Sequence, residues 1–191
     1  MKYAPSFKLW HWLNAFVVLG LLGTVFLRKT FLSWKTNSEI LMNELAELDI
    51  VVSLEQAKEL AIAIRAGMWE WHIILGYALA SLLAYRVVLF FIGATKKKSF
   101  IKMSPHKKGV EIVYYLFYGA LFFMATSGML MVYYEELSFS KDLRSDIKEV
   151  HELVFNFILF FTLIHTVGIV SAELGKEKGI ISNMISTRKN N

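Results

Sequence analysis

Four stretches of the chain are almost free of charged residues, and they set the expected architecture. They are Leu9–Leu27, Ile73–Gly93, Ile112–Tyr134 and Leu153–Ala172, and the one charge within them is Arg86. A membrane-spanning helix needs about 20 apolar residues, and each stretch is close to that length. A buried helix of a soluble protein is usually shorter and carries a polar face. The pattern predicts an all-α integral membrane four-helix bundle, with helices at about 8–28, 69–93, 109–134 and 148–173.

The segment between the first two predicted helices, residues 36–66, is too long for a plain connection. Apolar residues recur at helical spacing in its first half, at Ile40, Leu41, Leu45 and Leu48. Ser53 followed by Gln56 has the pattern of a capping box at the start of a second short helix. We therefore expect a short amphipathic helical insertion within a single membrane domain of residues 1–191. The insertion is either a structural lid or a docking surface for a redox partner.

Composition and charge agree with a membrane protein and give an orientation. The chain is 55% hydrophobic and carries a net charge of +5. Residues 28–70 are net acidic, with seven carboxylates against five basic groups. Basic residues lie instead near both termini and in the loop 94–109, at Lys2, Lys8, Lys96, Lys97, Lys98, Lys102, Lys107, Lys108, Lys176, Lys178, Arg188 and Lys189. The positive-inside rule then puts both termini in the cytoplasm and the insertion in the periplasm.

The same charge pattern bears on the partners and on the first apolar stretch. Anionic lipid headgroups account for a basic cytoplasmic face, so membrane lipid is the expected partner and nucleic acid is not. The first stretch has no small-residue cleavage site and is too long for a signal-peptide core. We therefore expect it to be a retained membrane helix.

Four of the five histidines lie within or at the ends of apolar segments. His11 is near the cytoplasmic start of the first helix, whereas His72 and His151 open the second and fourth helices on the periplasmic side. His165 follows His151 by fourteen residues. That interval is roughly 21 Å along a helix and returns to within about 40° of the same face. Depth therefore pairs His11 with His165 and His72 with His151.

Paired histidines at two depths indicate a particular kind of cofactor. One membrane histidine alone is often an interhelical hydrogen-bond partner, but four matched in depth indicate function, since such groups are costly in a bilayer. A single metal ion would need the four clustered within a few ångströms. Two haems fit two layers, because each iron takes one axial nitrogen from either side. The chain has no Cys, so we expect two non-covalent b-type haems.

Two further residues and one group of small residues carry weaker signals. Arg86 follows His72 by fourteen residues and so falls in the layer of His11 and His165. There it either pairs with a haem propionate or extends to nearby headgroups. His106, in the lysine-rich loop, is expected to be a solvated loop residue, the alternative being a role near a cytoplasmic quinone headgroup. Small residues in the third helix let a macrocycle or a neighbouring helix approach closely; they are Gly119, Thr126, Ser127 and Gly128.

Several segments resemble the bacterial dihaem cytochrome b superfamily, which includes prokaryotic cytochrome b561 and the b-type subunits of Ni,Fe-hydrogenases and formate dehydrogenases. The resemblance rests on residues 9–12 (LWHW), 69–77 (WEWHIILGY), Tyr85-Arg86, His151-Glu152, His165 and the basic tail 182–189. It covers nearly the whole chain and implies that the four histidines ligate two haems. The chain departs from the family at the acidic insertion and at Ser104-Pro105-His106, where many relatives have an Asn-Pro turn.

The resemblance implies transmembrane electron transfer in the bacterial inner membrane, between the quinone pool and a periplasmic cytochrome or dehydrogenase subunit. The alternative is a stand-alone superoxide:quinone oxidoreductase, and a third possibility is a non-redox haem-handling membrane protein. The chain has little extramembrane mass and no room for its own flavin or iron–sulfur domain. That favours an electron-transfer subunit and leaves the enzyme open.

Overall fold

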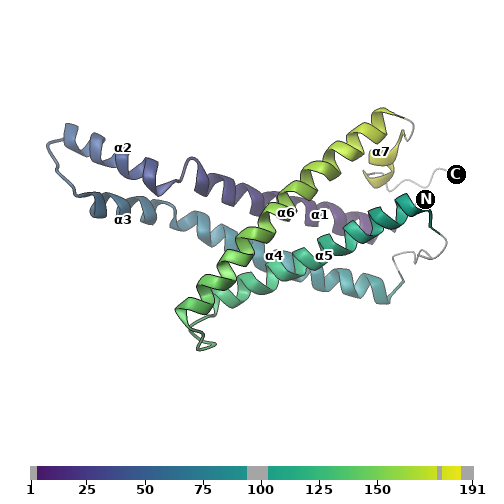
Figure 1. The fold of residues 1–191 in the computed structure, drawn as a ribbon. Coiled ribbons are helices and arrows are strands. Elements are labelled where there is room, and N and C mark those ends of the chain that lie inside the picture. The colour runs from purple at the N-terminus through teal and green to yellow at the C-terminus, as the bar shows by residue number, and fades with distance from the viewer. Residues whose placement is uncertain (1–3, 94–102, 176–177, 186–191) are drawn as a thin grey trace. The chain divides into compact units, whose positions relative to one another are not determined.

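The computed structural model describes residues 4–93, 103–175 and 178–185, which are helical apart from short connections (Figure 1). The helices are α1 (Pro5–Lys29), α2 (Trp34–Glu47), α3 (Leu54–Ile64), α4 (Ala66–Phe91), α5 (Pro105–Val132), α6 (Lys141–Leu174) and α7 (Ile180–Ile185). No strand occurs in these ranges, so the predicted all-α class is confirmed. The predicted helical insertion is present as α2 and α3.

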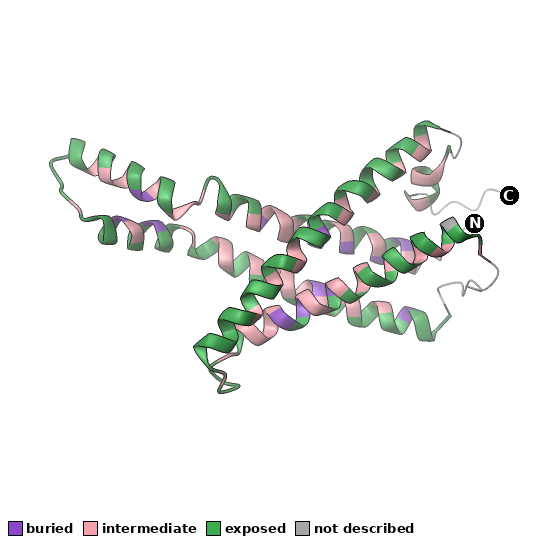
Figure 2. Cartoon of the chain, viewed as in Figure 1, coloured by how far each residue is buried: buried purple, intermediate pink, exposed green. Residues whose placement is uncertain are grey.

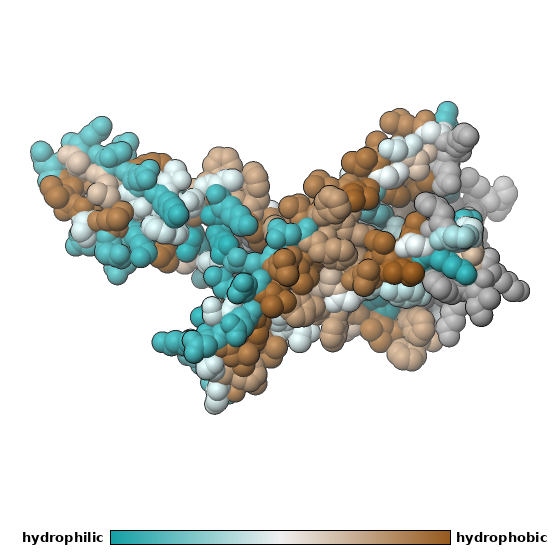
Figure 3. Space-filling view, viewed as in Figure 1, coloured by the Kyte–Doolittle hydropathy of each residue, from teal (hydrophilic) through white to brown (hydrophobic). Residues whose placement is uncertain are grey.

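Four segments are long and apolar enough to cross a membrane, namely Pro5–Lys29, Leu54–Phe91, Lys107–Val132 and Lys141–Leu174. At most 22% of the apolar window of any of them is buried within the protein. Apolar exposure on this scale is unfavourable in water and is the normal state of helices covered by lipid. Figure 3 shows apolar side chains gathered along α5 and α6. The predicted membrane protein with four spanning helices is confirmed.

Helices α5 and α6 begin before the charge-free stretches because each starts with a polar first turn. Pro105 opens α5, where its fixed φ suits a helix and its missing N–H leaves no donor unsatisfied. Lys141 opens α6, and the Ser140 hydroxyl accepts a hydrogen bond from the Leu143 backbone N–H. The prediction of His106 as a loop residue is therefore wrong. Its backbone lies in the first turn of α5, and its side chain falls outside the described residues.

Contacts between Cα atoms divide the chain into two compact units. Unit 1 comprises Met1–Ala15 and Leu79–Asn191, and unit 2 comprises Phe16–Ala78. The single membrane domain expected from the sequence stays a prediction. Many of the basic residues that set the expected orientation fall outside the described ranges, namely Lys2, Lys96, Lys97, Lys98, Lys102, Lys176, Arg188 and Lys189.

In unit 2, α2 and α3 pack against each other through small side chains. The buried residues of these two helices are Ser38 of α2 and Ala57 and Ala61 of α3. Figure 2 shows buried positions on both helices. Ser53 caps α3, because its hydroxyl accepts a hydrogen bond from the Gln56 backbone N–H and the Gln56 side chain accepts one from the Ser53 N–H. The predicted capping box is therefore confirmed, and it fixes where the second half of the insertion becomes helical.

In unit 1, α5 packs on α6, and α7 folds back against α6. The Glu173 carboxylate accepts hydrogen bonds from the backbone N–H groups of Gly179 (2.9 Å) and Ile181 (3.0 Å). Gly179 has a φ of 92°, in the left-handed region that glycine adopts at low cost. The Trp12 indole donates to the Met184 carbonyl at 3.3 Å. The described part of the C-terminal segment is thus tied to both α6 and the start of α1.

Candidate functional site

His11 on α1 and His165 on α6 lie together within unit 1. Their ring centroids are 6.4 Å apart, and the ring planes make an angle of 66°. Both side chains are half-buried. The neighbouring Trp10 is 2% exposed, and its indole donates a hydrogen bond to the Leu82 carbonyl of α4 at 2.7 Å. The structure therefore brings together the two histidines that the sequence pairs at the cytoplasmic depth.

Aromatic side chains of α5 and α6 surround His165. Phe161, one turn earlier on α6, stacks on the imidazole with centroids 5.7 Å apart and planes within 7°. Phe117 of α5 stacks in turn on Phe161, at 3.9 Å. The Tyr114 hydroxyl lies 3.4 Å from the His165 Nδ1 atom. These contacts restrict the orientation of the imidazole, and the Tyr114 contact at Nδ1 is a long one.

Arg86 of α4 lies in an aromatic cage of unit 1. Its guanidinium carbon is 5.1 Å from the ring centroid of Phe7, 5.2 Å from that of Trp10 and 5.5 Å from that of Tyr118. Cation–π attraction favours this arrangement. The Nε and Nη1 atoms of Arg86 are buried and have no hydrogen-bond partner among the described residues. A buried guanidinium in this state requires an acceptor, preferably a carboxylate.

His151 of α6 faces α5 in unit 1. The His151 Nδ1 atom lies 2.7 Å from the Ser127 hydroxyl oxygen. A Cβ atom added to Gly128 would lie 3.8 Å from the His151 Cε1 atom, which is an ordinary van der Waals contact. No atom would lie within 4 Å of a Cβ atom added to Gly119. Neither glycine of the predicted group of small residues is therefore required by close packing, whereas Ser127 of that group contacts His151 directly.

His72 of α4 lies in unit 2, and its partner is on α1. The His72 Nδ1 atom is 2.7 Å from the Thr24 hydroxyl oxygen, and Thr24 is buried. The Trp69 ring meets the imidazole edge to face at 5.4 Å. Because His72 belongs to unit 2 and His151 to unit 1, the pairing of these two histidines stays a prediction.

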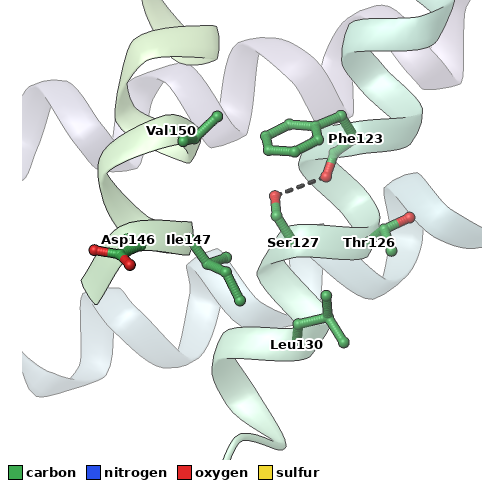
Figure 4. A pocket seen from close by; sticks show the side chains of 7 residues that line it. All are labelled: Phe123, Thr126, Ser127, Leu130, Asp146, Ile147 and Val150. Carbon is green, nitrogen blue, oxygen red and sulfur yellow. Dashed lines mark hydrogen bonds between the residues drawn. The ribbon is translucent and has the colours of Figure 1, made fainter. Parts of the chain in front are cut away.

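A shallow groove opens between α5 and α6 beside Ser127. Its volume is about 260 Å³, and it is lined by Phe123, Thr126, Ser127, Leu130, Asp146, Ile147 and Val150 (Figure 4). The lining is almost wholly apolar apart from the hydroxyls and the Asp146 carboxylate. A groove of this size is below the usual range for ligand pockets, so it does not define a site by itself.

Sequence reasoning missed the hydroxyl partners of the histidines. No sequence pattern marks Thr24 or Tyr114, and Ser127 stands out in the sequence only as a small residue. Ser and Thr are common within membrane helices, where they hydrogen-bond to their own backbone. Which hydroxyl meets a histidine depends on helix packing, and no spacing rule links Ser127 to a residue 24 positions later on another helix.

The donor groups and their separation fit a b-type haem. An iron held between two imidazoles, with bonds of about 2 Å as for other first-row metals, places the ring centroids roughly 6.3 Å apart. The 6.4 Å between His11 and His165 agrees with this separation. The buried, unpartnered nitrogens of Arg86 suit a propionate. Within the described ranges no three His, Cys, Asp or Glu side chains cluster closely enough to hold a bare metal ion.

Comparison with known proteins places the chain in a family. The family model described as prokaryotic cytochrome b561 matches residues 2–187, which is nearly the whole sequence. No curated protein and no solved structure matches the chain. The resemblance found in the histidine segments is therefore confirmed over the same span. The chain belongs to the prokaryotic cytochrome b561 family.

Proposed function

We propose that this protein transfers electrons across the membrane through two b-type haems, between the quinone pool and a periplasmic redox partner. Membership of the cytochrome b561 family indicates b-type haem, transmembrane electron transfer and a bacterial membrane protein. The number of haems, their ligands, the quinone and the partner are parts of the proposal.

The separation of His11 and His165 carries this proposal. These two imidazoles come from different helices, and a centroid separation of 6.4 Å would suit two histidines that hold one iron between them. We assign the first haem to this pair and the second haem to His72 and His151. Arg86 supplies a guanidinium to a propionate of the first haem, since its buried nitrogens have no protein acceptor in the described part of the chain.

The protein's contribution is to bind, to orient and to exclude water. A bound haem supplies a centre that gains or loses one electron without gaining or losing a ligand. The stacked rings of Phe117 and Phe161 hold His165 from one side and so restrict the orientation of its imidazole. The aromatic cage holds the Arg86 guanidinium in place by cation–π attraction. These features suit a site of electron transfer rather than a site that makes or breaks covalent bonds.

Orientation and partner follow from charge. Basic residues near both termini support cytoplasmic termini in the inner membrane. The α2–α3 hairpin then lies on the periplasmic side, and its surface carries several carboxylates, including Glu39, Glu44 and Glu59. A basic cytochrome or a basic face of a dehydrogenase subunit would be complementary to this surface.

Haem quantitation on the purified full-length chain tests the proposal. Reduced-minus-oxidised spectra and pyridine haemochrome analysis should give two low-spin b haems per chain. Replacing His11 or His165 by Ala should remove one haem, and replacing His72 or His151 should remove the other. A control replacement of His106 should leave both. Fewer than one haem per chain, or loss of haem in other combinations, would contradict the assignment.

A further inference from the structure

Two hydroxyl groups beside the proposed ligands have already committed their single hydrogen. The Ser127 hydroxyl donates to the Phe123 carbonyl at 2.6 Å (Figure 4). It also lies 3.4 Å from the Met124 carbonyl. The Thr24 hydroxyl donates to the Leu21 carbonyl at 2.7 Å. A hydroxyl has one hydrogen to donate and two lone pairs that accept. Each of these oxygens can therefore act only as an acceptor toward a third group.

That third group is the Nδ1 atom of a histidine in both cases. The Ser127 oxygen is 2.7 Å from His151 Nδ1, and the Thr24 oxygen is 2.7 Å from His72 Nδ1. When the hydroxyl hydrogen is directed to the helix carbonyl, the hydrogen between oxygen and nitrogen belongs to the imidazole. Both rings are then protonated at Nδ1, and Nε2 carries the lone pair.

We propose that Ser127 and Thr24 are positioning residues, which hold His151 and His72 in the one tautomer that can bind iron through Nε2. This inference rests on the proposed function, because it takes His151 and His72 as haem ligands. Neither hydroxyl touches the haem. Each acts through the imidazole, as the outer partners of metal-bound histidines generally do.

The His11 and His165 pair lacks an equivalent arrangement. The Tyr114 oxygen is 3.4 Å from His165 Nδ1, beyond the distance of a strong hydrogen bond. No side-chain hydrogen bond reaches the His11 ring within the described residues. The two short hydroxyl contacts thus distinguish the His72 and His151 pair, and they come from two separate helices.

An acceptor on Nδ1–H has a measurable consequence at the iron. It increases the basicity of Nε2 and so favours the ferric over the ferrous state. Removing the acceptor should raise the midpoint potential of the haem that His72 and His151 hold, and leave that of the other haem unchanged. The expected change is about tenfold in the reduction equilibrium, or about 59 mV for a one-electron couple.

Potentiometric titration of the haem-loaded full-length chain, followed by visible and EPR spectra, tests this. The variants are Ser127→Ala and Thr24→Ala, with Ser127→Thr and Thr24→Ser as the conservative replacements that keep a hydroxyl. Thr126→Ala is the matched control, because the Thr126 hydroxyl also donates to a carbonyl of its own helix, Phe122, but on a different side of α5 (Figure 4).

The inference is supported if each alanine variant raises the midpoint potential of the His72 and His151 haem and the hydroxyl-bearing replacement restores it. Thr126→Ala should leave both midpoint potentials unchanged. If an alanine variant instead loses one haem, support requires that this be the haem lost in His151→Ala and that the hydroxyl restore it. Two bound haems with unchanged potentials would overturn the inference and leave the proposed function standing. A wild-type chain without haem would overturn both.

Discussion

Arg86 lies in an apolar helix, and its guanidinium is surrounded by three aromatic rings from other helices. Two of its buried nitrogens, Nε and Nη1, have no acceptor among the described residues. If a haem propionate is that acceptor, Arg86→Met removes a charge-assisted bond of about 1.5–3 kcal/mol. We expect one of the two haems, the one lost in His11→Ala, to bind about 10 to 100 times more weakly. Haem titration of the depleted protein measures this.

Arg65→Met is the matched control for that substitution. The Nε atom of Arg65 is also buried without a partner, but Arg65 is the C-cap of α3 and lies outside the predicted apolar stretches. We expect Arg65→Met to retain both haem affinities. If Arg86 only extends to lipid headgroups, Arg86→Met will behave in the same way, and the propionate assignment will be wrong.

For single residues, the cost of burying a side chain in lipid determines whether it can be recognised as a candidate site residue in the sequence. Histidine and arginine are conspicuous in charge-free stretches because burying them in lipid is costly. Hydroxyl-bearing residues are not conspicuous there, because a helix supplies carbonyl acceptors for them and the free-energy cost of burying them is small. This applies to Thr24, Ser127 and Tyr114. The candidate ligands can therefore be identified from the sequence, whereas the hydroxyls beside two of them are apparent only in the structure.

At the scale of helices, the α2–α3 hairpin depends on its capping interactions. Ser53 makes both bonds of the capping box, and its replacement by Ala should cost about 1 kcal/mol of α3 stability. Hydrogen exchange of the α3 amides should accelerate accordingly, by about fivefold. Ser33→Ala is the control, because Ser33 is the N-cap residue of α2 but makes no side-chain cap bond. Equal acceleration in both variants would refute the role of the box.

The apolar stretches predict that a helix is present, but other residues determine where it begins and ends. Charge-free stretches identify the part of each helix that lies in hydrocarbon, and all four such parts were found in this way. The polar starts of α5 at Pro105 and α6 at Lys141 depend instead on a proline and a capped serine. The Lys148–Glu152 ion pair on α6, at 3.8 Å, belongs to the same exposed region. Hydropathy does not detect such polar turns, and the prediction of a loop at His106 is wrong for this reason.

For the whole molecule, the surroundings of the two proposed haems predict an order of potentials. In the proposed tautomer, His72 and His151 both donate Nδ1–H to hydroxyl oxygens at 2.7 Å, which would favour ferric iron. The His11 and His165 pair has a single weak contact of this kind, and the Arg86 cation beside Trp10 would stabilise the additional electron of a reduced haem. The His72 and His151 haem should therefore have the lower midpoint potential.

Electrons then pass favourably from the His72 and His151 haem to the His11 and His165 haem, which in the proposed orientation is from the periplasmic to the cytoplasmic side. Potentiometric titration of the wild-type chain should resolve two midpoints. In His72→Ala the lower midpoint should disappear, and in His11→Ala the higher one. Arg86→Met and Ser127→Ala should each narrow the gap, the first by lowering the upper potential and the second by raising the lower one. The opposite order in the histidine variants would mean that burial, rather than hydroxyl acceptors and the Arg86 charge, determines the potentials.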